Sequence, residues 1–197
     1  MKKQALLITI KNPVLGKVKT RLAAGLGREK ALEIYLSLVR HTCEVALQTE
    51  ADRYLYYSDF VDETDEWPSD RFYKKAQTTG DIGHRMSRCF EETLPLYEKA
   101  ILVGSDIPGL SAGILAEAFE KLSQNDFVIG PAEDGGYYLI GMKAFYPTVF
   151  EQITWSVPTV FEETIQQMEA LGKSWSAVKT LSDVDNVDDW EKHGWEI

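Results

Sequence analysis

The chain has 197 residues, 31 acidic and 21 basic, and a formal net charge of −10. An apolar fraction of 44% is too high for a disordered chain, so we expect one folded domain over residues 1–197. The net negative charge argues against nucleic acid or an anionic membrane as partner, and no apolar run reaches the roughly 18 residues of a membrane span. No secretory signal is evident, and two cysteines without metal spacing fit a reducing compartment, so we expect a cytoplasmic protein.

Short apolar runs alternate with helical patterns along the chain. Strands are predicted at 4–10, 53–58, 71–76, 100–103, 127–130, 137–142 and 175–181, and helices at 28–48, 81–94, 111–122, 160–171 and 187–193. The first run is almost continuously apolar, which is typical of a strand covered on both faces. This alternation predicts a three-layer α/β/α sandwich around a mostly parallel sheet.

Ligands of open α/β sheets bind beyond the carboxyl ends of the strands, so the turns there are candidate sites. The first turn, residues 11–22, carries cations, a glycine and a hydroxyl: Lys11, Lys17, Lys19, Arg21, Gly16 and Thr20. Converging cations are what a diphosphate needs, whereas a solvated charged loop is the alternative interpretation. The turn matches neither a P-loop nor a GxGxxG fingerprint.

A second candidate lies at residues 77–86, where a helix is predicted to begin. Gly80 and Gly83 leave room for a base or phosphate to approach the backbone, and Arg85 follows one turn later. Asp81 is equally well explained as a nucleotide contact or as the N-cap of the helix.

Carboxylates follow two later strands. Asp106 comes directly after the buried run 100–103, where it could hold Mg²⁺ or Mn²⁺ against a diphosphate or begin an ordinary turn. Asp134, with Gly135 and Gly136, could bind sugar hydroxyls and act as general base, although a plain hairpin also favours Asp-Gly. Trp155 follows a short predicted helix and is a candidate for the acceptor wall, while tryptophans are more often packing residues.

The acidic segment 181–190 offers further carboxylates near the end of the chain. It could equally be a solvated helix start. Asp183 and Asp185 alternate on an extended stretch, and we expect only one of them to face a shared metal ion.

In this order, the segments 11–22, 77–86, 104–110, 130–141, 155–156 and 183–185 resemble a bacterial family of small GT-A-type glycosyltransferases. That family, long treated as a domain of unknown function, is associated with arsenosugar biosynthesis or selenodomain proteins. It is similar to nucleotide-diphospho-sugar transferases and to nucleotidyltransferases such as the phospholactate and molybdenum-cofactor guanylyltransferases.

The resemblance implies a GT-A sandwich, a nucleotide over the first turn and a divalent metal ion. It places the phosphates at Lys11, Gly16, Lys17, Lys19 and Arg21, the base or ribose near Gly80 and Asp81, the metal at Asp106 and Asp185, and the sugar or acceptor at Asp134, Gly135 and Gly136. The Asp-x-Asp pair that many glycosyltransferases carry at the metal site is replaced here by Gly104-Ser105-Asp106. This departure keeps the nucleotidyltransferase interpretation open.

The expected activity is metal-dependent transfer of a glycosyl group from a nucleotide-diphosphate sugar to a small acceptor. Asp106 would hold the metal, and Asp134 would deprotonate the acceptor hydroxyl if the reaction inverts. In the alternative, a phosphorylated acceptor attacks a nucleoside triphosphate and pyrophosphate leaves, with Lys17, Lys19 and Arg21 on the β and γ phosphates. A third hypothesis is a nucleotide-sensing module without turnover.

Overall fold

The computed structural model describes residues 4–197. Seven strands form one sheet in the order β3-β2-β1-β4-β6-β5-β7. Their bounds are β1 Gln4–Ile10, β2 Asp52–Tyr57, β3 Tyr73–Ala76, β4 Lys99–Val103, β5 Phe127–Pro131, β6 Tyr137–Met142 and β7 Trp175–Ala177. Strand β6 runs antiparallel to both of its neighbours, and the other strand pairs are parallel. The mostly parallel sheet predicted from the sequence is therefore confirmed.

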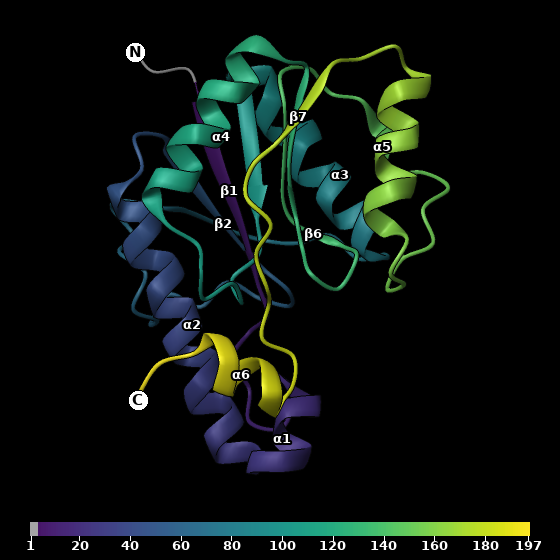
Figure 1. Cartoon of the computed structure of the whole chain (residues 1–197). Coiled ribbons are helices and arrows are strands. Elements are labelled where there is room, and N and C mark those ends of the chain that lie inside the picture. The colour runs from purple at the N-terminus through teal and green to yellow at the C-terminus, as the bar shows by residue number, and fades with distance from the viewer. Residues whose placement is uncertain (1–3) are drawn as a thin grey trace.

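Six α-helices accompany the sheet. They are α1 Thr20–Leu26, α2 Arg28–Gln48, α3 Ile82–Thr93, α4 Ala112–Gln124, α5 Val160–Ala170 and α6 Val187–His193, with short 3-10 turns at Leu94–Leu96 and Pro147–Phe150. Helices α2 and α4 cover one face of the sheet, and α3 and α5 cover the other (Figure 1). The three-layer α/β/α arrangement is that expected from the alternation of strands and helices.

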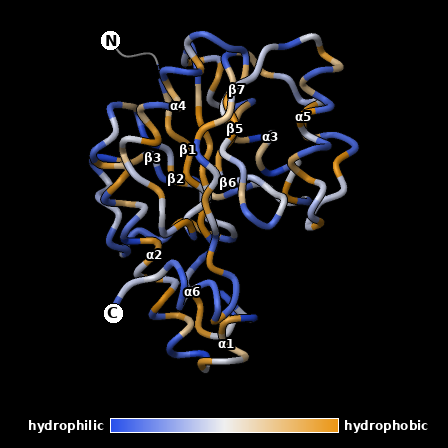
Figure 2. Tube along the Cα trace, viewed as in Figure 1, coloured by the Kyte–Doolittle hydropathy of each residue, from blue (hydrophilic) through white to orange (hydrophobic). Residues whose placement is uncertain are grey.

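Strand β1 explains why its sequence is almost continuously apolar. Successive side chains of a strand point to opposite faces, so Leu6 and Ile8 join the core under α2 and α4, while Ala5 and Leu7 join the core under α3 and α5. All four side chains are fully buried. Figure 2 shows the hydrophobic residues gathered along the central strands, with hydrophilic residues on the outer loops and helices.

A small helical lobe extends beyond the sheet, formed by α1, α6 and the first half of α2 (Figure 1). Its own core contains Leu22, Ile34, Leu38 and Val184. Helix α1 was not among the predicted elements, because it has seven residues, no side-chain N-cap and a single buried side chain, Leu22. Such a short helix depends on tertiary packing rather than on local preference.

One further difference concerns the last third of the chain. Strand β7 ends at Ala177 instead of continuing to Leu181, and Leu181 makes only an isolated bridge with Ala132. Cys43 and Cys89 are buried and free. Among residues 4–197, no helix combines the length and the apolar composition that crossing a bilayer requires.

Candidate functional site

A cavity of about 1000 Å³ lies at the carboxyl ends of the parallel strands. Its lining combines the turn after β1, the turn after β4, the hairpin between β5 and β6, the start of α3, and the segment that leads into α6. This is the edge at which ligands of open α/β sheets bind. The sheet order thus brings together the turns that the sequence singled out separately.

The backbone of the first turn is anchored by two buried side chains. The Tyr35 hydroxyl donates to the Lys11 carbonyl and accepts from the Lys11 N–H, both at 2.8 Å, and burial raises the pKa of this hydroxyl to about 12. The Asn12 amide donates to the Phe60 carbonyl at 2.9 Å, and its oxygen accepts the Asp59 N–H at 3.0 Å. Neither residue was predicted to belong to the site.

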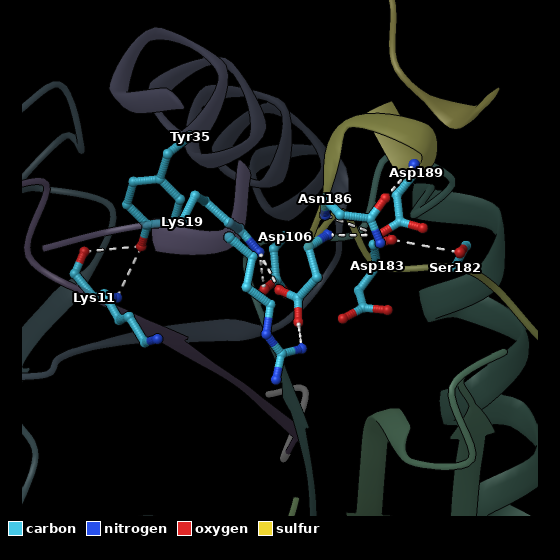
Figure 3. A network of polar contacts seen from close by, with 10 residues as sticks. Lys11, Lys19, Tyr35, Asp106, Ser182, Asp183, Asn186 and Asp189 are labelled. Carbon is cyan, nitrogen blue, oxygen red and sulfur yellow. Dashed lines mark hydrogen bonds and ion pairs between the residues drawn. The ribbon is translucent and has the colours of Figure 1, made fainter. Parts of the chain in front are cut away.

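Lys19 stands at the centre of the site. Its Nζ donates to Asp106 Oδ2 at 2.7 Å and to Asp185 Oδ1 at 3.3 Å, and only 6% of the side chain is exposed (Figure 3). Burial by itself would lower the pKa of Lys19, but the charges and hydrogen bonds of the two carboxylates outweigh it, so the pKa lies above its ordinary value. The two carboxylates therefore favour the charged ammonium over the neutral amine at this position.

Arg21, two residues further along the chain, contacts Asp185 as well. Its Nη1 lies 3.2 Å from Asp185 Oδ2, and the guanidinium remains largely exposed. An exposed ion pair of this kind contributes at most about 1 kcal/mol, so Arg21 is free to exchange Asp185 for another anion.

The structure corrects the expectation that only one of Asp183 and Asp185 faces the metal site. Carboxylate oxygens of Asp106, Asp183 and Asp185 all lie within 4.8 Å of one another. In extended backbone, side chains two residues apart share a face, while Val184 between them is fully buried in the helical lobe. The spacing of the two acidic residues in the sequence already contained this signal.

The segment 183–186 is fixed by its neighbours. The Val184 N–H donates to the Asp106 carbonyl at 3.1 Å, which docks the segment on the turn after β4. The Asp189 carboxylate accepts the Asp185 N–H at 2.9 Å and the Asn186 N–H at 3.0 Å, and the Asn186 side chain caps α6 in return. The acidic cluster is therefore part of a well-defined turn rather than a solvated tail.

The negative charges of the carboxylates also affect the pKa of Asp183. Burial, followed by the charges of Asp106, Asp134 and Asp185, raises the pKa of Asp183 to about 6. Three carboxylates at this separation favour a cation between them, and oxygen ligands of this kind suit Mg²⁺ or Mn²⁺. Lys19 already supplies one positive charge at Asp106 and Asp185. The donor set therefore fits the divalent ion that the sequence predicted.

The start of α3 forms another side of the cavity. The Asp81 carboxylate accepts the His84 N–H at 2.8 Å, so Asp81 is the N-cap of α3, and Arg85 Nε donates to the Gly80 carbonyl at 3.0 Å. Gly80 has a φ of +124°, a backbone conformation that favours glycine.

A fixed wall closes the far side of the cavity. The Trp155 indole packs directly on Gly83, where a Cβ atom would lie 2.6 Å from the ring, and a Cβ at Gly135 would lie 2.0 Å from the Pro158 carbonyl oxygen. Glu163 accepts the Thr154 N–H and the Thr159 hydroxyl, each at 2.6 Å, and these hydrogen bonds hold its pKa below the ordinary value. The segment 154–159 is thus held between two glycines and a carboxylate.

Most of the predicted site residues line this one cavity. They are Lys11, Lys17, Lys19, Thr20, Arg21, Gly80, Arg85, Asp106, Asp134, Gly136, Trp155 and Asp185. Gly16, Asp81 and Gly135 do not belong to the lining: Gly16 lies against Arg28, Asp81 caps α3, and Gly135 supports Pro158. Asp183 and Tyr137 line the cavity although neither was among the predicted site residues.

Comparison with known sequences decides the family. Residues 40–157 match DUF2064, described as an uncharacterized protein conserved in bacteria. The chain belongs to the DUF2064 family. A comparison with curated proteins gives no match.

Several solved structures are similar to this chain. The chain is 32% identical, with a TM-score of 0.87, to a protein from Desulfovibrio desulfuricans G20 described as a candidate nucleotide-diphospho-sugar transferase, over 94% of this chain and 84% of that one. The CMP:2-keto-3-deoxy-manno-octonic acid synthetase complexed with CTP is 11% identical over 97% of this chain and 96% of that one, with a TM-score of 0.60. A 4-diphosphocytidyl-2C-methyl-D-erythritol synthase from Anaerococcus prevotii DSM 20548 is 14% identical over 98% and 97%, also with a TM-score of 0.60. The last two comparisons concern the fold alone.

Proposed function

We propose that this DUF2064 protein transfers a glycosyl group from a nucleotide-diphosphate sugar to a small acceptor with the help of a divalent cation. One observation carries the proposal: within one cavity, the cations of the first turn face the carboxylates of Asp106, Asp183 and Asp185, and Lys19 joins the two sets. A diphosphate needs the cations, and its metal ion needs the carboxylates.

Each group then has a defined role. Asp106, Asp183 and Asp185 would hold Mg²⁺ or Mn²⁺, which supplies Lewis-acid stabilisation of the diphosphate. Lys17, Lys19 and Arg21 neutralise the negative charge that develops on the leaving nucleoside diphosphate. Lys11, from the turn after β1, and Gly80 and Arg85, from the start of α3, would contact the nucleotide.

Asp134 is the general base of the proposed reaction if it inverts the sugar. Its Oδ1 accepts the Gly136 N–H at 2.9 Å, which orients the carboxylate at the cavity wall. The acceptor oxygen forms a bond to the anomeric carbon, the bond from that carbon to the diphosphate oxygen breaks, and the hydroxyl proton passes to Asp134.

The alternative is nucleotidyl transfer to a phosphorylated acceptor with release of pyrophosphate. It is supported by the fold that the chain shares with the two cytidylyl-type neighbours, one of them bound to CTP. The glycosyl-transfer proposal is supported by the description of the more similar D. desulfuricans protein.

Product analysis separates these activities. The protein is incubated with Mg²⁺ and, separately, with a panel of nucleotide sugars and a panel of nucleoside triphosphates. We expect slow hydrolysis of one nucleotide sugar to the nucleoside diphosphate and no pyrophosphate from any triphosphate. Pyrophosphate release would overturn glycosyl transfer in favour of the alternative, and nucleotide binding without any product would indicate a sensing module.

Matched variants tie the turnover to the site. Asp106→Asn and Asp185→Asn each remove one carboxylate of the cluster and should lower the Mg²⁺-dependent rate by about 100-fold or more. Asp188→Asn is the control, because Asp188 is exposed in the first turn of α6 and lies outside the cavity lining. A cluster variant that keeps the wild-type rate would contradict the metal assignment.

A further inference from the structure

The turn after β1 is attached to the rest of the protein by one hydroxyl at its first residue. Strand β1 ends at Ile10, which makes the last pairing with Tyr57 of β2, so Lys11 is the first residue beyond the strand. There the Lys11 N–H donates to Tyr35 Oη, and Tyr35 Oη donates to the Lys11 carbonyl, each at 2.8 Å (Figure 3). The Tyr35 hydroxyl thus takes the place of a neighbouring strand for both backbone groups of Lys11.

The Tyr35 side chain is itself fixed by burial. It comes from α2, is only 3% exposed, and belongs to the core cluster that also contains Ile10 and Val18, the residues on either side of the turn. The turn has few other attachments. The Asn12 N–H donates to Ser58 Oγ at 3.1 Å, and beyond Asn12 the backbone of residues 13–18 makes hydrogen bonds only within the turn, as far as the described part of the chain shows.

The Tyr35 hydroxyl lines the cavity but has no hydrogen to offer a phosphate. A tyrosine hydroxyl carries a single hydrogen, and Tyr35 donates it to the Lys11 carbonyl. Burial raises the pKa of Tyr35 to about 12, so the group keeps this hydrogen at neutral pH. The Lys11 side chain, in contrast, is exposed, lines the cavity and forms no ion pair within residues 4–197. Lys11 is therefore the group that can meet an anion, and Tyr35 is the group that holds Lys11.

We propose that Tyr35 is a positioning residue for the diphosphate: by holding both backbone groups of Lys11, it sets the place of the Lys11 ammonium relative to the pair of Lys19 and Asp106. Tyr35 acts through Lys11 and does not bind the ligand. Such positioning matters because a displacement of about 1 Å in a binding group can cost as much as about 100-fold. The inference rests on the proposed function, and it holds equally for nucleotidyl transfer, since both reactions place a nucleotide at this turn.

Isothermal titration calorimetry with inorganic pyrophosphate and Mg²⁺ tests the inference on the full chain. Tyr35→Phe removes one oxygen atom, and with it both hydrogen bonds to Lys11, and should weaken binding roughly three- to tenfold. Tyr56→Phe is the matched control. Tyr56 is 2% exposed, its hydroxyl lies 3.3 Å from Thr93 Oγ1 in the core on the other face of the sheet, and it does not line the cavity. Its replacement also removes a buried hydroxyl but should change the affinity by less than about twofold.

Double variants show whether Tyr35 acts through Lys11. Lys11→Met removes the ammonium, so the addition of Tyr35→Phe should then weaken binding by less than about twofold. Lys17→Met removes another cation of the same turn, one that Tyr35 does not hold, and in that background Tyr35→Phe should keep its full effect. A general loss of stability would lower the affinity equally in both backgrounds. Calorimetric Tm values of all variants ensure that every titration is made on folded protein.

The outcomes separate the inference from the proposed function. Wild-type affinity in Tyr35→Phe, an equal loss in Tyr56→Phe, or a full effect of Tyr35→Phe in the Lys11→Met background would overturn the positioning role alone. Absence of pyrophosphate binding by the wild type would instead contradict the diphosphate site of the proposed function, and the positioning role with it. Pyrophosphate release from a triphosphate would overturn glycosyl transfer and leave the role of Tyr35 intact.

Discussion

Lys19 has two sets of anionic partners available to it: the carboxylates that it binds here and the phosphates proposed above. Its φ of 46° lies in the left-handed region, which is unfavourable for a lysine, and the ion pairs with Asp106 and Asp185 hold it there. A metal ion at the carboxylates would satisfy them in place of Lys19. The ammonium would then be available to a diphosphate oxygen.

Replacement of Lys19 by methionine tests this exchange. Lys19→Met keeps the length of the side chain but leaves Asp106 and Asp185 without their buried cation, so we expect the metal-free protein to lose about 1–2 kcal/mol, or roughly 3–6 °C in Tm. Mg²⁺ or Mn²⁺ should restore more of the Tm in the variant than it adds to the wild type. Differential scanning calorimetry with and without a chelator measures both effects.

Lys17→Met is the control for the loss of one positive charge from the same turn. Lys17 is exposed, and its replacement should change the stability by less than about 0.5 kcal/mol. An equal effect of metal on Lys19→Met and on the wild type would mean that Lys19 and the metal do not share the carboxylates.

At the level of single residues, the sequence identified candidate side chains but not their partners. The basic turn and Asp106 could be singled out from residue type and position after strands, whereas Asp185 was assigned from the family resemblance. The ion pair between Lys19 and Asp106 joins residues 87 positions apart, and local patterns carry no information on such a contact. Tyr35 and Asn12 resemble ordinary core and turn residues until the backbone of the turn is seen to depend on them.

The crossing of α1 and α6 determines how the two charged segments meet. Helix α1 follows Lys19, and α6 follows Asp185, so any displacement between these helices separates the cations from the carboxylates. Their contact is tight at Gly25, where a Cβ atom would lie 2.5 Å from Val187 Cγ2. The glycine is required here by close approach rather than by its backbone angle.

An alanine at Gly25 should therefore loosen the site. We expect Gly25→Ala to weaken the Mg²⁺-dependent binding of pyrophosphate several-fold. The added methyl group costs about 1–3 kcal/mol of stability through overpacking, which exceeds the gain of about 1 kcal/mol from the higher helix propensity of alanine. The two helices should therefore move apart and separate the cations from the carboxylates. Val187→Ala removes the clashing methyl group and should restore binding in the double variant. Isothermal titration calorimetry of the wild type, the two single variants and the double variant gives the coupling free energy between positions 25 and 187. Wild-type affinity in Gly25→Ala would show that the contact between α1 and α6 does not position the site.

The elements that could be predicted are those with their own local signals. Helix α6 was predicted with its observed bounds, in a segment whose acidic residues suit a helix start, and the capping box of Asn186 and Asp189 supports it. Helix α1 has no such signal and exists because Leu22 packs against α2 and Val184. Strand β7 is shorter than predicted because only its first three residues pair with β5.

At the scale of the whole molecule, the net charge of −10 is distributed unevenly along the chain. Residues 1–30 contain eight basic side chains and one acidic side chain, while the acidic residues are spread over the remainder. The cavity is the place where the described part of the basic segment meets the carboxylates of the turn after β4 and of the segment before α6. A small anion with its metal ion matches this arrangement, whereas a long polyanion would meet the acidic surface.

Binding at this junction should stabilise the entire fold. We expect Mg²⁺ and a nucleoside diphosphate together to raise the Tm more than the sum of their separate effects, because each ligand occupies one side of the Lys19 network. At a concentration 100 times Kd the gain is about 2.7 kcal/mol, or roughly 5–10 °C for a chain of this size. A thermal-shift titration measures it, and strictly additive shifts would contradict a joint site.

The separation along the chain of the two halves of the site has a consequence for its biosynthesis. Lys19 and Asp185 are 166 residues apart, so a ribosome makes the turn proposed to bind phosphate long before it makes the last carboxylate of the cluster. Until the Val184 N–H docks on the Asp106 carbonyl, a growing chain has most of its sheet but lacks two of the three carboxylates of the cluster. Under the proposed function, nucleotide and metal would bind together only after synthesis has passed Asp185, and they would not guide the earlier steps of folding.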